Sequence, residues 1–207
     1  MKFKKYTWVI SLIILITIVV VIVNIDRILD IDLVPEDDFL SDEDLVLIDN
    51  EQFEFVNNPD GILIEEFSDF ECPMCRKVYP LVHNMLIKYN GQINFQFKHL
   101  PLDYHKHAYK AALASECARD QGKFFEYHDL LFRKGPDGNL EKYAEALGLD
   151  TAAFNQCLTT KATEGRVNRD MQEAMQREVQ GTPWFFVNGK NVWFDEVEPL
   201  IIDSLQK

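Results

Sequence analysis

Basic residues are scarce in this chain of 207 residues. Lysine and arginine number 21 against 34 aspartates and glutamates, which gives a formal net charge of −13. A nucleic-acid-binding protein needs a basic face, so the composition argues against a nucleic-acid partner. The sequence contains no internal repeat and no low-complexity tract, and the roughly 160 residues from Leu45 onward suffice for one domain with its own core.

Cysteine is also rare, and only one pair, Cys72 and Cys75, has the CxxC spacing. A structural zinc site needs four ligands, but Cys117 and Cys157 are distant and belong to no second CxxC. The histidines at 99, 105 and 107 do not have the regular spacing of zinc ligands. A purely structural disulfide within the motif is also disfavoured, because so short a loop restricts few unfolded conformations. A redox-active dithiol is the favoured interpretation, and a metal site is the alternative.

The N-terminus combines three lysines with one long apolar run over residues 6–25. About 20 apolar residues are enough for a helix to cross a bilayer. The run is longer than the apolar part of a cleavable signal peptide, and no small-residue cleavage site follows it. We therefore expect residues 1–25 to form a cytoplasmic tail and a transmembrane signal anchor, and removal of this segment as a cleaved signal peptide is the alternative. The lysines before the span predict export of the rest of the chain, where disulfides persist.

An acidic stretch follows the apolar run. Residues 26–54 hold twelve acids and a single base, Arg27, for a net charge of −11. Residues 26–44 are predicted to be a self-repelling, solvated linker. The runs Leu45–Ile48 and Phe53–Val56 instead resemble a first strand or hairpin, so the folded domain is predicted to span residues 45–207.

The position of Cys72 and Cys75 favours thiol chemistry. An apolar, strand-like run over residues 62–67 precedes them, and a helical pattern follows. The free N–H groups and dipole at a helix N-terminus favour a thiolate, so Cys72 is predicted to be the attacking sulfur. Pro73 fits the first helical turn, where its missing N–H costs nothing. Cys75, one turn further along, is placed to resolve a mixed disulfide.

The remaining pattern predicts an α/β fold. After the helix, residues 93–97 alternate like a strand with one covered face, and an Ala-rich helical region spans about 103–179. Two short apolar runs flank Asn188-Gly189, a strong hairpin signal, and a closing helix follows over 196–205. The predicted order is strand, strand, helix, strand, helices, hairpin and helix.

Three segments in this order carry a family resemblance. They are Phe67-Ser-Asp-Phe-Glu-Cys-Pro-Met-Cys75, Gly122-Lys-Phe-Phe-Glu-Tyr-His-Asp-Leu-Leu-Phe132 and Gly181-Thr-Pro-Trp-Phe-Phe-Val-Asn-Gly189. Together they resemble the DsbA-like branch of the thioredoxin superfamily over nearly the whole chain from Leu45. The resemblance implies a thioredoxin-like fold with a central mixed sheet and an inserted α-helical domain, here preceded by the transmembrane helix.

The resemblance also implies roles for single residues. Cys72 corresponds to the exposed nucleophile and Cys75 to the resolving thiol. Pro183 matches the family's cis-proline, and Thr182 before it would present its backbone to substrate. Glu66 matches the buried acid that relays a proton to the resolving cysteine, although the adjacent Glu65 competes for that assignment because alternation turns one of the pair outward.

Two further features follow from the resemblance. Cys117 and Cys157 lie in the helical region, where some relatives carry a second disulfide, and we expect them to pair in an exported chain. Met74 stands where the strongest oxidants of this type have a histidine, so thiolate stabilisation must come from the helix terminus and neighbouring donors. The direction of electron flow is open on the sequence alone.

The resulting hypothesis is a membrane-anchored, extracytoplasmic thiol–disulfide oxidoreductase. Its substrates would be unfolded or reduced exported proteins, and its redox partner in the membrane is expected to be quinone-coupled. The bilayer is a partner through residues 6–25, and no organic cofactor or metal is required. Three alternatives stay open: a reductase or isomerase of the same fold, a metal-binding module, and a redox-inert peptide-binding protein.

Overall fold

The structure, a computed structural model, describes residues 58–206. The anchor predicted at 6–25, the acidic linker at 26–44 and the strand runs at 45–48 and 53–56 lie outside the described residues. Within residues 58–206, no helix is both long and apolar enough to cross a membrane.

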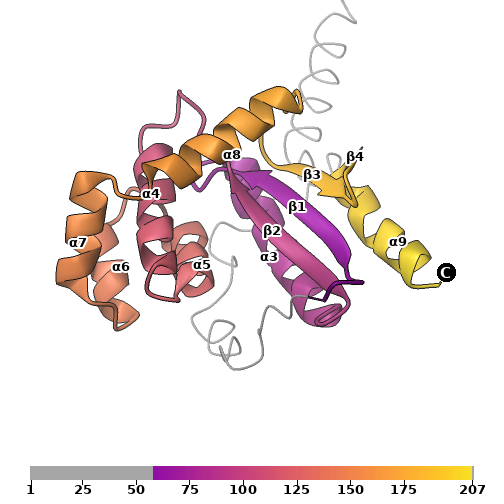
Figure 1. The fold of residues 1–207 in the computed structure, drawn as a ribbon, viewed down its shortest axis with the longest axis horizontal. Helices are drawn as coiled ribbons and strands as arrows, with labels where there is room; N and C mark the ends of the chain where they lie inside the picture. Colours follow the sequence, from indigo (N-terminus) through magenta and orange to yellow (C-terminus); the bar gives the residue numbers. More distant parts are fainter. Residues whose placement is uncertain (1–57, 207) are drawn as a thin grey trace, which may run out of the picture. The chain divides into compact units, whose positions relative to one another are not determined.

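A four-stranded mixed sheet forms the centre of the domain, in the order β2-β1-β3-β4 (Figure 1). Its strands are β1 (Ile62–Ser68), β2 (Ile93–His99), β3 (Trp184–Val187) and β4 (Lys190–Val192). β1 runs parallel to β2 and antiparallel to β3, and the β3–β4 pair is an antiparallel hairpin. The hairpin turns at Asn188 and Gly189, which both have positive φ, as a tight two-residue turn requires.

Helices cover both faces of the sheet. α3 (Pro73–Lys88) and α9 (Phe194–Leu205) pack on one face, where Ile64, Phe95 and Val187 meet α3 side chains such as Val82. α8 (Glu164–Gln176) packs on the other face, where Ala174 meets Phe67 and Phe186. The strand alternation explains this division, because neighbouring residues of β1 face opposite sides.

The inserted helices form a group at one end of the sheet (Figure 1). They are α4 (Ala108–Arg119), α5 (Phe124–Lys134), α6 (Leu140–Ala146) and α7 (Thr151–Thr160), and α8 leads back from them to the sheet. α4 carries a run of buried alanines, which lets its neighbours approach closely. Asn139 and Asp150 cap the N-termini of α6 and α7 through their side chains. The thioredoxin-like α/β fold with a mixed sheet is therefore confirmed.

Candidate active site

The two cysteines of the CxxC motif lie at the start of α3, directly beyond the carboxyl end of β1. Cys72 is the N-cap residue of α3, and Pro73 occupies the first helical turn. A short turn connects β1 to this position, and in it the Cys72 N–H donates to the carbonyl oxygen of Asp69 at 3.1 Å. Both thiols are free; Cys72 is 6% exposed, and Cys75 is fully buried. Cys72 is therefore the more accessible of the two sulfurs, but it is largely buried rather than exposed as the resemblance implied.

The surroundings of the two thiols shift their pKa values in opposite directions. The pKa of Cys72 is lowered to about 5, and the largest cause is a hydrogen bond from the Cys75 side chain. Burial acts in the opposite direction and raises the pKa of Cys72. Hydrogen bonds from the Thr182 side chain and from the backbone N–H groups of Cys75 and Met74 lower this pKa further. The pKa of Cys75 is raised, first by burial and then by the neighbouring Cys72 and by the charge of Glu66. Cys72 is thus poised as a thiolate and Cys75 as a thiol.

The loop before β3 faces the nucleophile. The Thr182–Pro183 peptide bond is cis, and Cys72 Sγ lies 3.4 Å from the carbonyl oxygen of Thr182, to which it donates while it is protonated. The fold thus brings together residues that are 110 positions apart in the chain. Met74 is 54% exposed and contributes its backbone rather than its side chain to Cys72.

Glu65 and Glu66 divide between the two faces of the sheet, and neither points into solvent. The expectation that one of them is turned outward is wrong, because both faces of the sheet are covered by helices. Glu66 is 3% exposed, and burial raises its pKa to about 7, while the Ser68 side chain works in the opposite direction. Glu65 instead receives a bidentate ion pair from Arg177, with N–O distances of 2.8 and 2.9 Å. Glu66 is therefore the carboxyl group available to Cys75.

Lys98 does not act on Glu66. In the β1–β2 register Glu66 lies beside Phe97, which places Lys98 on the opposite face. The Lys98 ammonium binds Glu173 at 2.9 Å, as part of the α8 network that also holds Arg177. Glu66 consequently has no lysine counter-charge from this strand.

Two features near the cysteines were missed from the sequence. The Asp69 carboxylate is buried and accepts from the N–H groups of Glu71 and Leu102 and contacts His105 Nδ1, at 2.7 to 2.8 Å. It therefore fixes the turn before Cys72 against the loop that leads to α4.

Trp193, 75% exposed, stands beside Trp184 with ring centroids 6.4 Å apart. A pocket of about 260 Å³ runs between them and Pro183.

The other aromatic residues near the motif are part of the core. Phe70 is buried against Phe97 and Phe132, and Phe185 is buried in the sheet. The Trp184–Trp193 pair instead provides aromatic surface in the pocket that Pro183 also lines. Within residues 58–206, no group of three or more histidine, cysteine or acidic side chains is arranged to hold a metal ion.

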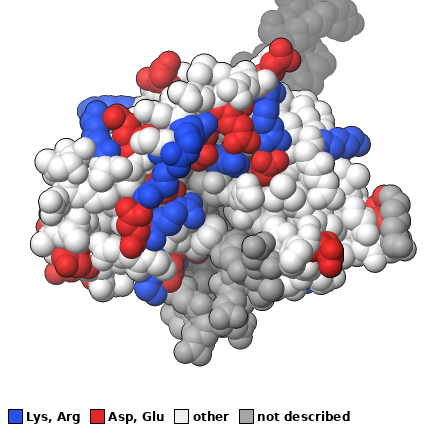
Figure 2. Space-filling model, in the orientation of Figure 1, with Lys and Arg blue, Asp and Glu red and all other residues white. Residues whose placement is uncertain are grey.

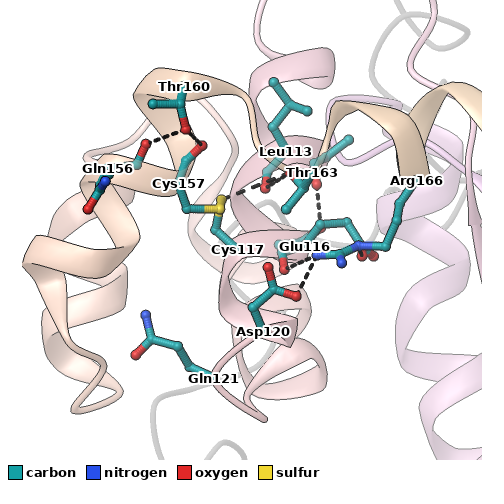
Figure 3. Close-up of a disulfide and its surroundings, with 12 residues drawn as sticks. Leu113, Glu116, Cys117, Asp120, Gln121, Gln156, Cys157, Thr160, Thr163 and Arg166 are labelled. Atoms are coloured by element: carbon teal, nitrogen blue, oxygen red, sulfur yellow. Dashed lines mark hydrogen bonds and ion pairs between the residues drawn. A yellow bond between two sulfur atoms is a disulfide. The ribbon is translucent and has the colours of Figure 1, made fainter.

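The second cysteine pair lies in the helical group, away from the motif. Cys117 on α4 and Cys157 on α7 are joined by a disulfide that closes a separation of 40 residues (Figure 3). The Thr163 hydroxyl donates to the Leu113 carbonyl oxygen beside it, which ties the start of α8 to α4. The bridge is buried on the α4 side and contacts neither Cys72 nor Cys75.

Comparison with known proteins gives consistent results. A family model described as Thioredoxin matches residues 61–206. The crystal structure of oxidised BdbD from Bacillus subtilis has a TM-score of 0.62 and 25% sequence identity, covering 73% of this chain and 90% of that one. MdbA, a thiol-disulfide oxidoreductase from Corynebacterium diphtheriae, has a TM-score of 0.60 and 19% identity, covering 72% of this chain and 86% of that one.

A curated relative is similar over part of its length only. The Na(+)/H(+) antiporter NhaA 3 of Salinispora tropica is 40% identical over 133 residues, which cover 62% of this chain and 20% of that protein. The chain thus spans about a fifth of this relative.

Proposed function

This chain belongs to the thioredoxin family, in its DsbA-like branch, and from this premise we propose that it is a membrane-anchored, extracytoplasmic thiol–disulfide oxidoreductase that acts through Cys72 and Cys75. The observation that carries the proposal is the asymmetry of the dithiol. One sulfur has a strongly lowered pKa at a helix N-terminus, and the other is buried and protonated. The antiporter activity named for the curated relative is not transferred, because the chain matches only a fifth of that protein.

In the oxidising direction, a substrate thiolate attacks Cys72 of the Cys72–Cys75 disulfide. The bond between the two enzyme sulfurs breaks, a mixed disulfide forms on Cys72, and Cys75 leaves and takes up a proton. The second substrate thiolate then attacks the substrate sulfur of the mixed disulfide and releases Cys72 as a thiolate. The substrate loses two electrons, and the enzyme dithiol carries them to a redox partner, for which we propose a quinone-coupled membrane protein.

The lowered pKa of Cys72 supports the oxidising direction. Stabilising the released thiolate favours the reduced enzyme and so makes its disulfide a stronger oxidant. Equilibration with glutathione buffers measures this directly. A potential near that of thioredoxin, roughly −270 mV, would favour the reductase or isomerase alternative, whereas a clearly higher value supports an oxidase.

Replacing Cys75 by alanine should trap substrates. A thiolate at Cys72 can still form a mixed disulfide, but no neighbouring thiol remains to resolve it, so covalent complexes should accumulate on Cys72. Complexes purified from cells and separated without reductant would identify both clients and the redox partner. The matched control is Cys72→Ser/Cys75→Ala, which should trap none; equal trapping by both variants would contradict the assignment of Cys72.

Glu66 is proposed to exchange the proton of Cys75 during resolution. Because its pKa is about 7, the carboxylate form grows as the pH rises through 7, and resolution of a mixed disulfide should accelerate over the same range. Glu66→Gln should slow that step by roughly 100-fold and remove this pH dependence, while alkylation of Cys72 stays unchanged. Stopped-flow kinetics of a preformed mixed disulfide measure the step; an unaltered pH profile in the variant would exclude the role.

A further inference from the structure

A buried ion pair joins the end of α8 to the centre of the sheet. Glu65 on β1 is 7% exposed, and the Arg177 guanidinium binds it through two hydrogen bonds of 2.8 and 2.9 Å. Arg177 also donates to Glu173 on its own helix at 2.8 Å, and Glu173 binds Lys98 of β2. Figure 2 shows basic and acidic side chains interleaved over α8. Stability alone does not account for the buried pair, because well-packed apolar residues often stabilise a protein interior equally well.

The same guanidinium lies over an aromatic ring of β3. Arg177 Cζ is 3.5 Å from the centre of the Phe186 ring, which is a cation–π contact. Phe186 is the register partner of Glu65 in the pairing of β1 with β3. Arg177, the C-cap residue of α8, therefore holds the end of this helix to two neighbouring strands at one level of the sheet.

The segment that follows Arg177 carries the loop that faces the nucleophile. α8 ends in a Schellman turn, in which the N–H of Val179 donates to the Ala174 carbonyl oxygen at 2.9 Å and Glu178 has a positive φ of 57°. The Val179 side chain packs against the cluster that contains Ala174. Only two residues then separate Val179 from Thr182, so a shift at the end of α8 would move Thr182.

We propose that Arg177 is a positioning residue for thiol–disulfide exchange, which holds the end of α8 to β1 and β3 and thereby keeps Thr182 against Cys72. The pairing of β3 with β1 fixes one end of the loop, and Arg177 fixes the other. The Thr182 carbonyl oxygen lies 3.4 Å from Cys72 Sγ as a result. The inference rests on the proposed function, because the loop matters to exchange only if an extended substrate pairs with its backbone.

Two properties of the active site should depend on this contact. The Thr182 side chain is one of the groups that lower the pKa of Cys72, so release of the loop should raise that pKa. A peptide substrate also needs the backbone of the loop in place, whereas a small thiol does not. A purely structural role for Arg177 would lower the free energy of unfolding but would change neither property in the folded protein.

The double variant Glu65→Gln/Arg177→Gln tests the proposal without leaving a buried carboxylate unpaired. The midpoint of iodoacetamide labelling of Cys72 in the reduced protein should rise by about one pH unit, as expected for the loss of one hydrogen bond to the thiolate. For the oxidised protein, the rate constant for reduction by a dithiol peptide, divided by that for dithiothreitol, should fall about 10-fold. Urea titration verifies that the measured protein is folded.

The matched control is Glu116→Gln/Arg166→Gln. It makes the same two changes in a buried ion pair that joins α8 to α4, and it should leave both readouts unchanged. Arg177→Lys keeps a charge beside Glu65 but lacks the planar fork of the guanidinium. This variant should fold even if the double variant does not, and it should move both readouts in the same direction by smaller amounts.

Wild-type values of both readouts in Glu65→Gln/Arg177→Gln and in Arg177→Lys would overturn the proposal. Equal changes in the control variant would overturn it as well, because they would show a general effect of weakening the contacts of α8. Wild-type protein that reacts with neither the peptide nor dithiothreitol would overturn the proposed function and this inference with it. The two failures are therefore distinguishable, since the first leaves the exchange activity of the wild type intact.

Discussion

Replacing Cys72 by serine should reduce thiol–disulfide exchange to less than about a thousandth of the wild-type rate. A hydroxyl can neither form a disulfide nor ionise near neutral pH, and Cys75 cannot substitute because it is fully buried and its pKa is raised. The turnover of a dithiol peptide substrate measures the loss. Circular dichroism and the melting temperature serve as controls for folding, since serine is close to cysteine in size.

Alkylation of the two thiols should depend on pH in a way that the pKa shifts define. The folded pKa of Cys72 is about 5, below the ordinary thiol value of roughly 8.5, so its thiolate persists down to about pH 5 and is lost below it. Iodoacetamide should therefore label the reduced protein on Cys72 with a midpoint near pH 5, and Cys75 should stay unlabelled through neutral pH. A midpoint near pH 8.5 on Cys72 would remove the basis of the proposed function.

The local parts of this site could be predicted from the sequence. A CxxC placed between an apolar strand and a helix puts the first cysteine at the helix N-terminus, because the strand ends where the helix must begin. The Asn188-Gly189 hairpin is likewise set by its own residues, since few other residues accept positive φ at both positions. These features depend on neighbours within a few residues.

The other parts depend on tertiary contacts that no local pattern specifies. Glu65 and Glu66 are adjacent and chemically equal in the sequence; they differ because Arg177, 112 residues away from Glu65, binds Glu65 and not Glu66. The contact of the buried Asp69 carboxylate with His105 and the exposure of Trp193 depend in the same way on loops that meet in space. Alternation correctly separates the two glutamates but does not reveal that both sides of the sheet are covered.

Removing the Cys117–Cys157 disulfide should strongly lower the free energy of unfolding. The bridge closes a separation of 40 residues, and the chain-entropy model gives about 4 kcal/mol for a loop of this length. The double variant Cys117→Ala/Cys157→Ala should therefore lose about that much free energy of unfolding, a large share of the 5–15 kcal/mol typical of a domain. Urea titration of the non-reduced proteins measures the difference.

The activity of the folded variant should be unchanged, because the bridge joins α4 to α7 and contacts neither Cys72 nor Cys75. In the presence of excess reductant, wild type and variant should converge toward one stability, since both then lack the cross-link. Equal stability without reductant would show that the bridge does not restrain the unfolded chain. A loss of exchange activity in fully folded variant would instead assign this second pair a part in the redox cycle, because folding alone would no longer account for its effect.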